Sequence, residues 1–343
     1  RFVIFTGDLK KNINLFANGD VEVIRFAPSA ICPKINPLLN KGSVKVCVFE
    51  KSNAPCNDSA KSSSIIPVFN EDAIIEESFN SIKNQTTKPD RLIYVNDSST
   101  DKTKQKILNL ASKIKWVDII DHISEEIHLP GGKIINAFYY GYEKLDEKYD
   151  IICKFDADIL LPKNYFESLK KIFRKDKKIG IAGGNLFVLK NGKWVYENIS
   201  AKSHVRGPIK AYRAECFKDI KGLRRSIGWD TVDVLLAQRY GWKIFTDYNL
   251  KVKHLRKTGD DYSLKSKLLQ GKALYIMRFG LVLSMLSLLK SSFNSLNLLK
   301  FLFGITGYIV SYLKREEFIV TYDEGEYIRK FRWKIIMTKY LKF

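Results

Sequence analysis

From residue 65 onward the chain alternates strand-like and helix-like segments, and this alternation limits the folds open to it. The apolar runs at 65–68 and 91–96, and another that starts at Ile151, have the length of buried strands. Segments 73–83 and 102–114 between them read as helices. Because such an alternation forms βαβ units, we predict an α/β domain with a mostly parallel sheet flanked by helices. Ligands should bind beyond the carboxyl ends of its strands.

Polar residues close the predicted strands. They are Pro67, Asn70 and Glu71 at the first strand, Asn96, Asp97 and Ser98 at the second, and Asp156 with Asp158 at a later one. The carboxyl ends of parallel strands meet at one edge of a sheet, so we expect these side chains to converge on a single crevice.

Asp156 and Asp158 are the main candidates for a metal site. Side chains two apart in a strand share a face, so these carboxylates can converge if the chain turns after Phe155, as Pro162 suggests. Mg²⁺ and Mn²⁺ take oxygen ligands, often one or two carboxylates together with substrate phosphates. An isolated Asp-x-Asp is more often a solvated loop, but the polar ends of the neighbouring strands favour the metal site here.

The composition is that of a globular protein with an excess of positive charge. The chain has 343 residues, 45% hydrophobic and 28% charged, so it can bury a substantial core. Its net charge of +21 indicates a partner or surface of opposite sign. Nucleic acid, anionic lipid and phosphorylated substrates all meet that requirement.

The cysteines bear on the compartment. Five cysteines are scattered without a C-x-x-C spacing, which argues against a zinc cluster and against a disulfide framework. The first residues lack the pattern of a signal peptide. We therefore expect a cytoplasmic protein, and the C-terminal helices leave open a peripheral position on the cytoplasmic face of a membrane.

The chain divides into three parts by composition. Residues 1–60 contain short β-like runs at 2–5, 21–26 and 44–49, separated by turn residues, and we predict a small β-rich segment without an assigned role. Residues 61–258 hold the α/β domain.

Residues 259–343 read as a helical, basic region. Its apolar runs 273–289 and 298–313 contain or adjoin basic residues, and neither offers the roughly 20 apolar residues that a membrane span needs. Two readings remain open, namely core helices or interfacial helices that dip into lipid while basic residues meet anionic headgroups. The basic and aromatic residues interleaved over 329–343 favour the second reading.

Three motifs, in this order and at this spacing, resemble the family 2 nucleotide-sugar glycosyltransferases of the GT-A fold. They are Ile66-Pro67-Val68-Phe69-Asn70-Glu71, Val95-Asn96-Asp97-Ser98-Ser99-Thr100-Asp101 and Asp156-Ala157-Asp158. The resemblance covers the chain from about Ser64 to about Thr258. It implies a GT-A domain that uses a nucleotide-sugar donor together with Mn²⁺ or Mg²⁺.

The resemblance assigns Pro67, Phe69, Glu71 and Asp97 to the nucleoside pocket. A carboxylate such as that of Asp97 can accept a hydrogen bond from the imino N–H of uracil, so we expect a UDP-sugar donor. The other reading of Asp97 is an Asx-turn after a strand.

The resemblance also implies which groups face the diphosphate. Lys133, in a segment similar to a glycine- and lysine-containing segment of the family, would meet it as a point charge. Asp156 and Asp158 would hold the cation, with Asp156 also facing the nucleotide. His254 matches a C-terminal histidine that many GT-A enzymes use as a further metal ligand, and Arg256 beside it would grip the diphosphate.

The segment from Gly228 to Asp233 is similar to the region that supplies the catalytic base, although Trp229 stands where the family has its first acid. Asp230 matches the acid that deprotonates the acceptor hydroxyl in inverting members, and Asp233, one helical turn further on, is the alternative. Gly207 and Trp229 would lie on the acceptor side.

We therefore predict an inverting, metal-dependent glycosyltransferase that acts on a glycan or lipid-linked acceptor, in contact with an anionic membrane surface if the interfacial reading holds. One alternative is a nucleotidyltransferase that makes sugar nucleotides, but residues 67–71 lack the glycine-rich phosphate loop of such enzymes. Another is a basic binding module for nucleic acid or membrane. The lysines form no recognisable nucleic-acid motif, so we expect no nucleic-acid partner.

Overall fold

The computed structural model describes residues 21–25, 44–48, 60–124, 131–145, 148–198, 204–256, 264–293 and 297–340. The chain forms two compact units, Arg1–Asn57 and Asp58–Phe343. In the first, β1 (Val21–Arg25) and β2 (Val44–Val48) pair in parallel. These strands coincide with two of the three β-like runs predicted there, and the run 2–5 lies outside the described residues.

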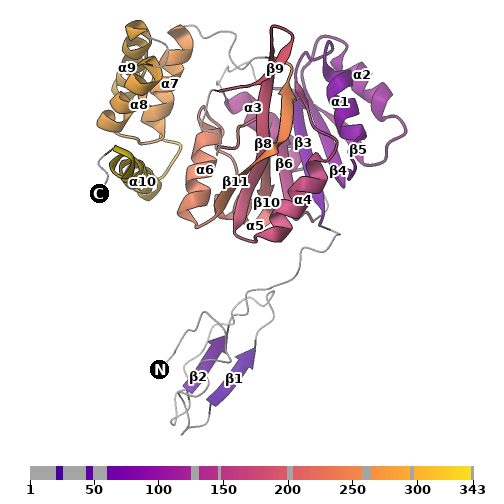
Figure 1. Cartoon of the computed structure of the whole chain (residues 1–343), viewed down its shortest axis with the longest axis horizontal. Coiled ribbons are helices and arrows are strands. Elements are labelled where there is room, and N and C mark those ends of the chain that lie inside the picture. Colours follow the sequence, from indigo (N-terminus) through magenta and orange to yellow (C-terminus); the bar gives the residue numbers. More distant parts are fainter. Residues whose placement is uncertain are drawn as a thin grey trace. The chain divides into compact units, whose positions relative to one another are not determined.

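The described part of the second unit is built on one sheet with the strand order β5-β4-β3-β6-β10-β8-β11-β7 (Figure 1). Four neighbouring strands run parallel, namely β5 (Val117–His122), β4 (Arg91–Asp97), β3 (Ser62–Val68) and β6 (Ile151–Phe155). β3 and β6 are buried throughout, as expected for parallel strands covered by helices on both faces. The predicted βαβ alternation is confirmed over this half of the sheet.

The remaining strands make the sheet mixed instead of mostly parallel. They are β7 (Ile159–Leu160), β8 (Ile179–Lys190), β9 (Lys193–Tyr196), β10 (Ile209–Arg213) and β11 (Lys243–His254). β10 runs antiparallel to both β6 and β8, with Ile209 opposite Phe155. No helix is described between the β8–β9 hairpin and β10, so nothing in the described residues carries the chain across to the other edge of the sheet. β10 therefore begins at the edge where β6 ends.

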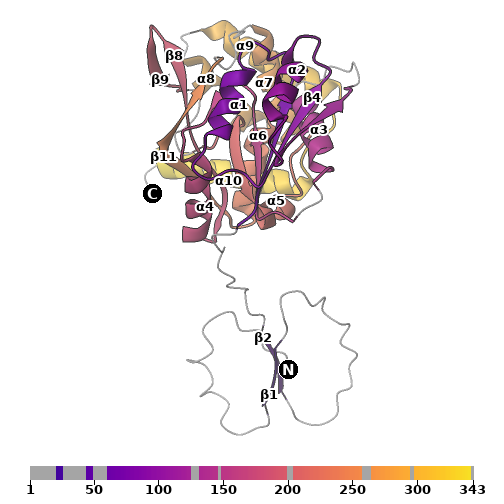
Figure 2. The ribbon, with the colours of Figure 1, turned by 90° about the vertical axis from the view of Figure 1, so that its right-hand side faces the viewer.

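Helices cover both faces of the sheet (Figure 2). Alternate strand residues point to opposite faces, so Ile65 and Ile66 of β3 belong to two different hydrophobic clusters. On the Ile66 side lie α1 (Ile75–Lys83), α2 (Thr103–Ala111) and α4 (Tyr165–Lys175). On the Ile65 side lie α3 (Gly132–Tyr142), α5 (Ala214–Asp219) and α6 (Trp229–Arg239). Ligand-binding residues therefore have to come from the strand ends.

In the described residues after the sheet lie the helices α7 (Leu264–Ile276), α8 (Leu281–Phe293), α9 (Leu298–Leu313) and α10 (Tyr322–Tyr340). Figure 1 shows α7, α8 and α9 together beside α6, on the opposite side of the unit from β5. The apolar run predicted over 273–289 is interrupted, because Arg278 and Gly280 both take positive φ and end α7 before α8 begins. Among the described helices, none combines the length and apolarity that crossing a membrane requires.

Candidate functional site

The loops that follow β3 and β4 are tied to each other by hydrogen bonds. Asn70 has φ 52° and Ser98 has φ 62°, a left-handed conformation that asparagine and serine in turns can adopt. The Asn70 side-chain oxygen accepts from the Thr100 amide at 2.9 Å, and the Glu71 amide donates to the Thr103 hydroxyl at 2.7 Å. These bonds hold the two predicted strand ends side by side.

Asp97, at the end of β4, is almost fully buried. Its Oδ1 lies 2.9 Å from His122 Nδ1 and also accepts from the Ser124 hydroxyl, while Lys133 Nζ lies 3.8 Å from Oδ2. The same ammonium group sits 4.7 Å from the ring centroid of Phe69, whose side chain is half exposed. Three residues singled out for the donor therefore lie together at the ends of β3 and β4. Pro67, another candidate for the nucleoside pocket, is buried within β3 itself.

A pocket of about 500 Å³ lies where β6 ends and where β10 and α6 begin. Many of the residues singled out from the sequence line it: Asp156, Asp158, Gly207, Trp229, Asp230, His254 and Arg256. Lys154 and Arg206 line it as well. The pocket joins residues that are far apart in the chain because β10 pairs with β6 and β11 ends beside β7.

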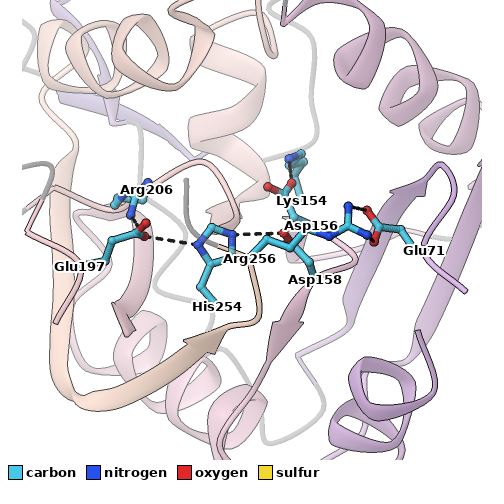
Figure 3. A network of polar contacts seen from close by, with 8 residues as sticks. All are labelled: Glu71, Lys154, Asp156, Asp158, Glu197, Arg206, His254 and Arg256. Atoms are coloured by element: carbon cyan, nitrogen blue, oxygen red, sulfur yellow. Dashed lines mark hydrogen bonds and ion pairs between the residues drawn. The ribbon is translucent and has the colours of Figure 1, made fainter. Parts of the chain in front are cut away.

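Glu71 connects the pocket to the residues at the end of β3 that were predicted to bind the nucleotide sugar. Its carboxylate forms a two-point ion pair with Arg256, at 3.0 Å from Oε1 to Nη1 and 2.7 Å from Oε2 to Nη2 (Figure 3). Burial raises the pKa of Glu71 to about 7, although the Arg256 guanidinium opposes the shift. Glu71, which follows β3, therefore holds Arg256, which follows β11, in the lining of the pocket.

The two acids of the Asp-x-Asp motif have different partners. Asp156 forms an ion pair with Lys154, a lysine that is almost fully buried in β6. Asp158 Oδ2 lies 3.3 Å from His254 Nε2, and its buried Oδ1 has no hydrogen-bond partner among the described residues. A buried carboxylate oxygen without a donor is costly unless a ligand satisfies it. The unpartnered oxygen of Asp158 is therefore a candidate ligand atom for a cation or for a hydrogen-bond donor of a substrate.

His254, at the end of β11, lies between two carboxylates. Its Nδ1 is 3.3 Å from Glu197 Oε2, and Glu197 is itself ion-paired with Arg206 (Figure 3). Burial lowers the pKa of His254, but the hydrogen bonds to Asp158 and Glu197 outweigh it and raise the pKa to about 9. The space between Asp158 and Glu197 therefore favours positive charge.

The side chains around Asp158 supply some, but not all, of the ligands that a divalent cation needs. No group of three or more His, Cys, Asp or Glu side chains with metal-binding geometry occurs among the described residues. Asp158 and His254 nevertheless supply two adjoining donors, and Glu197 can fix the histidine tautomer through Nδ1, as carboxylates beside metal-bound histidines do. Mg²⁺ sites of this sparse kind are completed by substrate phosphates.

Asp230 and Asp233, the two candidate bases, differ in exposure. Asp230 lies in the first turn of α6 and lines the pocket, only partly buried. Asp233 is 2% exposed, and both its oxygens accept from Lys210 Nζ, at 2.6 and 2.7 Å, with the Tyr212 hydroxyl bound to one of them. A carboxylate enclosed in this way has no access to an acceptor hydroxyl, so the accessible candidate is Asp230.

Trp229, at the position where the resemblance places an acid, lines the pocket. Lys154 Nζ and Lys210 Nζ lie 5.1 and 5.4 Å from its ring, within the range of cation–π contacts. A methyl group added to Gly207 would come within 3.1 Å of this ring, so only glycine fits there without a shift of its neighbour. Trp229 and Gly207 thus shape the side of the pocket next to Asp230.

The sequence analysis missed two functional candidates, Lys154 and Glu197. Lys154 could have been found, because it is the second-last residue of β6 and stands two residues before Asp156, a spacing that places two side chains on one face of an extended chain. Glu197 gives no local signal, because it meets His254 only through the pairing of β8 with β9 and β11.

The topology and the strand-end acids together define the GT-A class of α/β fold. The solved structure of GalNAc-T7 with UDP, GalNAc and Mn²⁺ is similar to this chain with a TM-score of 0.50 and 14% identity. The similarity covers 64% of this chain and 48% of that one.

Two other solved structures are less similar. The mannosyltransferase PcManGT from Pyrobaculum calidifontis, in complex with GDP-Man and Mn²⁺, has a TM-score of 0.46 and 14% identity over 63% of this chain. TarS 1–349 from S. aureus, in complex with UDP, has a TM-score of 0.47 and 15% identity over 75% of this chain and 92% of its own. This chain spans 62% of PcManGT, 40% of the longer TarS chain and 48% of GalNAc-T7.

The family model described as Glycosyl transferase family 2 matches residues 63–222. A search of curated proteins returned no match. Residues 63–222, somewhat less than half of the chain, contain all three motifs, the Asp-x-Asp among them, and this part of the chain is similar to glycosyl transferase family 2.

Proposed function

We propose that this chain is a metal-dependent glycosyltransferase that moves a sugar, with inversion, from a nucleotide diphosphate donor to a hydroxyl group of an acceptor. The observation that carries the proposal is the buried, unpartnered Oδ1 of Asp158 beside His254, in the same pocket as Asp230. A cation position and an accessible carboxylate in one pocket are what such a transfer needs.

The donor nucleoside would bind at the ends of β3 and β4. Asp97 would accept from the imino N–H of uracil, which makes a UDP-sugar the proposed donor. Phe69 offers a half-exposed ring for an apolar contact, and Lys133 beside it would meet the diphosphate. Pro67 and Glu71 complete this side, with Glu71 holding Arg256 toward the diphosphate.

The cation, Mn²⁺ or Mg²⁺, would be held by Asp158 and His254, with Asp156 nearby and the donor phosphates as further ligands. When bound, it acts as a Lewis acid that stabilises the charge on the departing nucleotide diphosphate. Lys154 neutralises Asp156, and Glu197 holds the His254 ring in place. Arg256 and Lys133 add positive charge beside the leaving group.

Asp230 would take the proton from the acceptor hydroxyl. Its place in the first turn of α6 stabilises the charged carboxylate through the helix dipole. With the base on the acceptor side and the cation on the leaving-group side, attack and departure occur at opposite faces of the sugar carbon, which inverts its configuration.

For the acceptor we propose a glycan or a lipid-linked glycan that approaches past Gly207 and Trp229. A lipid-linked acceptor would place the enzyme at the cytoplasmic face of a membrane. The basic and aromatic residues of 329–343 and the net charge of +21 support a peripheral association with anionic lipid.

The proposal is tested with the full chain, a panel of nucleotide sugars and Mn²⁺ or Mg²⁺, with release of the nucleotide diphosphate as the readout. We expect release from at least one UDP-sugar, and its loss with EDTA. Asp158→Asn should lower turnover at least about 100-fold and weaken Mn²⁺ binding measured by calorimetry in the presence of UDP. Asp323→Asn, an exposed acid of α10, is the matched control and should change neither. Equal turnover in Asp158→Asn and wild type would contradict the proposal.

A further inference from the structure

Helix α9 buries its small residues and exposes most of its leucines, while Phe301, Ile305 and Tyr308 pack partly buried against the core. Its fully buried positions are Gly304, Gly307 and Ser311. Leu298, Leu302 and Leu313, in contrast, are 69%, 49% and 71% exposed. A helix at the surface of a globular protein usually has one apolar stripe, turned inward, with polar residues on the opposite side, whereas α9 carries a second stripe that is exposed.

The reason for this orientation is the close approach of α7. A methyl group at Gly271 of α7 would overlap the carbonyl oxygen of Gly304, and one at Gly307 would overlap the carbonyl oxygen of Leu268. Small residues that let helix backbones approach in this way are typical of helices surrounded by lipid. The contact between α7 and α9 leaves no room for the leucines of α9, so they point outward.

The neighbouring helix α8 carries a second exposed stripe. Val282, Leu286 and Phe293 are 59%, 41% and 72% exposed, and their spacing places them on one side of the helix. α8 packs against α9 through Leu288, whose side chain lies where a methyl group on Gly304 would be. The exposed apolar residues of the two helices, here called the α8–α9 face, are Leu281, Val282, Met285, Leu286, Phe293, Leu298, Leu299, Leu302, Ile309, Val310, Tyr312 and Leu313.

Exposed apolar surface of this extent marks a binding surface in a soluble protein. The charge around it identifies the occupant. From Leu281 to Leu313 the sequence has no acidic residue, and its charged residues are Lys290 and Lys300. A second copy of this chain, with its net charge of +21, would bring like charges together, whereas anionic lipid headgroups would pair with both lysines.

We propose that the α8–α9 face is a membrane-docking surface, which lies in the headgroup region of an anionic bilayer with its leucines in contact with acyl chains. Helices of 13 and 16 residues are about 20 and 24 Å long, shorter than the roughly 30 Å hydrocarbon core, so they lie along the interface and do not cross it. This inference deepens the membrane association proposed above. It places the insertion on α8 and α9 instead of on the tail.

The test is co-sedimentation of the full-length protein with vesicles, without nucleotide sugar or metal. The vesicles contain phosphatidylcholine alone or with one third phosphatidylglycerol. We expect binding to the anionic vesicles that weakens at 0.5 M NaCl, because salt screens the lysine–headgroup attraction. The triple variant Leu298→Gln, Leu302→Gln and Leu313→Gln should lower the partition coefficient at least about tenfold.

A matched triple variant, Leu108→Gln, Ile123→Gln and Leu189→Gln, removes exposed apolar residues from the sheet domain and should bind as wild type does. Thermal unfolding of each variant checks that the fold is kept. Equal binding of the two triple variants would overturn the proposal. It would also be overturned if wild type proved to be a dimer by analytical ultracentrifugation that the α9 variant dissociates, because a second copy would then cover the face. None of these measurements involves glycosyl transfer. A negative result would therefore overturn the membrane-docking surface without bearing on the proposed enzymatic activity.

Discussion

At the scale of single residues, the acids in and around the pocket fall into two groups. Asp156 and Glu71 are each paired with a cation, as is the buried Asp233. Asp158 keeps a buried oxygen without a described partner, and Asp230 lies open to the pocket. The first group positions other side chains, whereas each acid of the second group offers a ligand at least one oxygen, although Asp158 Oδ2 also contacts His254. This division leads to different expectations for substitutions of otherwise similar residues.

Asp230→Asn should lower the rate of glycosyl transfer by 10² to 10⁴-fold while leaving donor affinity nearly unchanged. The amide keeps the shape of the carboxylate but cannot accept the proton of the acceptor hydroxyl. Steady-state kinetics with varied acceptor, together with calorimetry of UDP binding, measure the two effects. A variant that transfers sugar at the wild-type rate would remove Asp230 from the role of base.

Asp233→Asn should act mainly on stability. It leaves Lys210 buried without its carboxylate partner, and breaking a buried ion pair in this way costs about 3 kcal/mol or more. Urea unfolding measures the loss, and the double variant Asp233→Asn with Lys210→Met should recover part of it because the buried charge is then gone. If Asp233→Asn kept full stability and lost only activity, the result would contradict this prediction and favour Asp233 as the catalytic base.

Glu197→Gln should weaken Mn²⁺ binding by roughly 10 to 100-fold, because the amide no longer fixes the His254 ring as a carboxylate does. Calorimetric titration with Mn²⁺ in the presence of UDP gives the affinity. Glu197→Asp should recover part of the loss. Glu215→Gln, which alters an acid in the first turn of α5, is the control and should bind Mn²⁺ as wild type does.

At the scale of elements, strand direction determines where the site forms. β10 runs antiparallel between β6 and β8, so the loop that precedes it, with Gly207, reaches the end of β6 where Asp156 lies. A crossover helix before β10 would have brought the chain into the sheet from the opposite edge. The packing of α7 against α9 is limited by a different feature, because their close contact is made by glycines.

Gly271→Ala should destabilise the packing of α7 against α9 by about 1–3 kcal/mol, the usual cost of overpacking a close contact. Hydrogen exchange should then be faster in α7 and α9 and unchanged in β3 and β4. Thr306→Ala, at an exposed position of α9, is the control. Unaltered exchange in both helices would show that the contact tolerates a methyl group.

At the scale of the whole molecule, stability should depend on pH through His204. Burial lowers the pKa of His204 to about 4, and the nearby cations Lys210, Arg206 and Arg332 act in the same direction against Asp230. In the unfolded chain the pKa returns to about 6.5. Between these values the unfolded state binds more protons than the folded state, so stability falls as pH drops from 6.5 toward 4.

For this one group the loss between pH 7 and pH 5 is about 2 kcal/mol. Urea unfolding at both values should show a smaller difference for His204→Asn than for wild type. The same slope in both proteins would assign the pH dependence to other groups.

Sequence patterns predicted more of the strands than of the contacts. The strands at Arg91 and Ile151 and the helix Leu298–Leu313 were predicted nearly to their ends, because apolar periodicity is a local property. The ion pair of Lys154 with Asp156 and the contact of Glu197 with His254 were not predicted. The pairing of β8 with β11 that brings Glu197 to His254 involves residues far apart in the chain.

The sequence alone determined the α/β architecture, the resemblance to glycosyl transferase family 2 over residues 63–222 and the acids that close the strands, since each of these rests on residue types at short and regular spacings. Only the tertiary structure decided which acid is paired, which carboxylate stays accessible and which side of α9 faces outward. Those properties depend on burial and on partners that strand order and helix packing bring together, and no local pattern specifies them. The two acids Asp230 and Asp233, three residues apart in one helix, illustrate the difference.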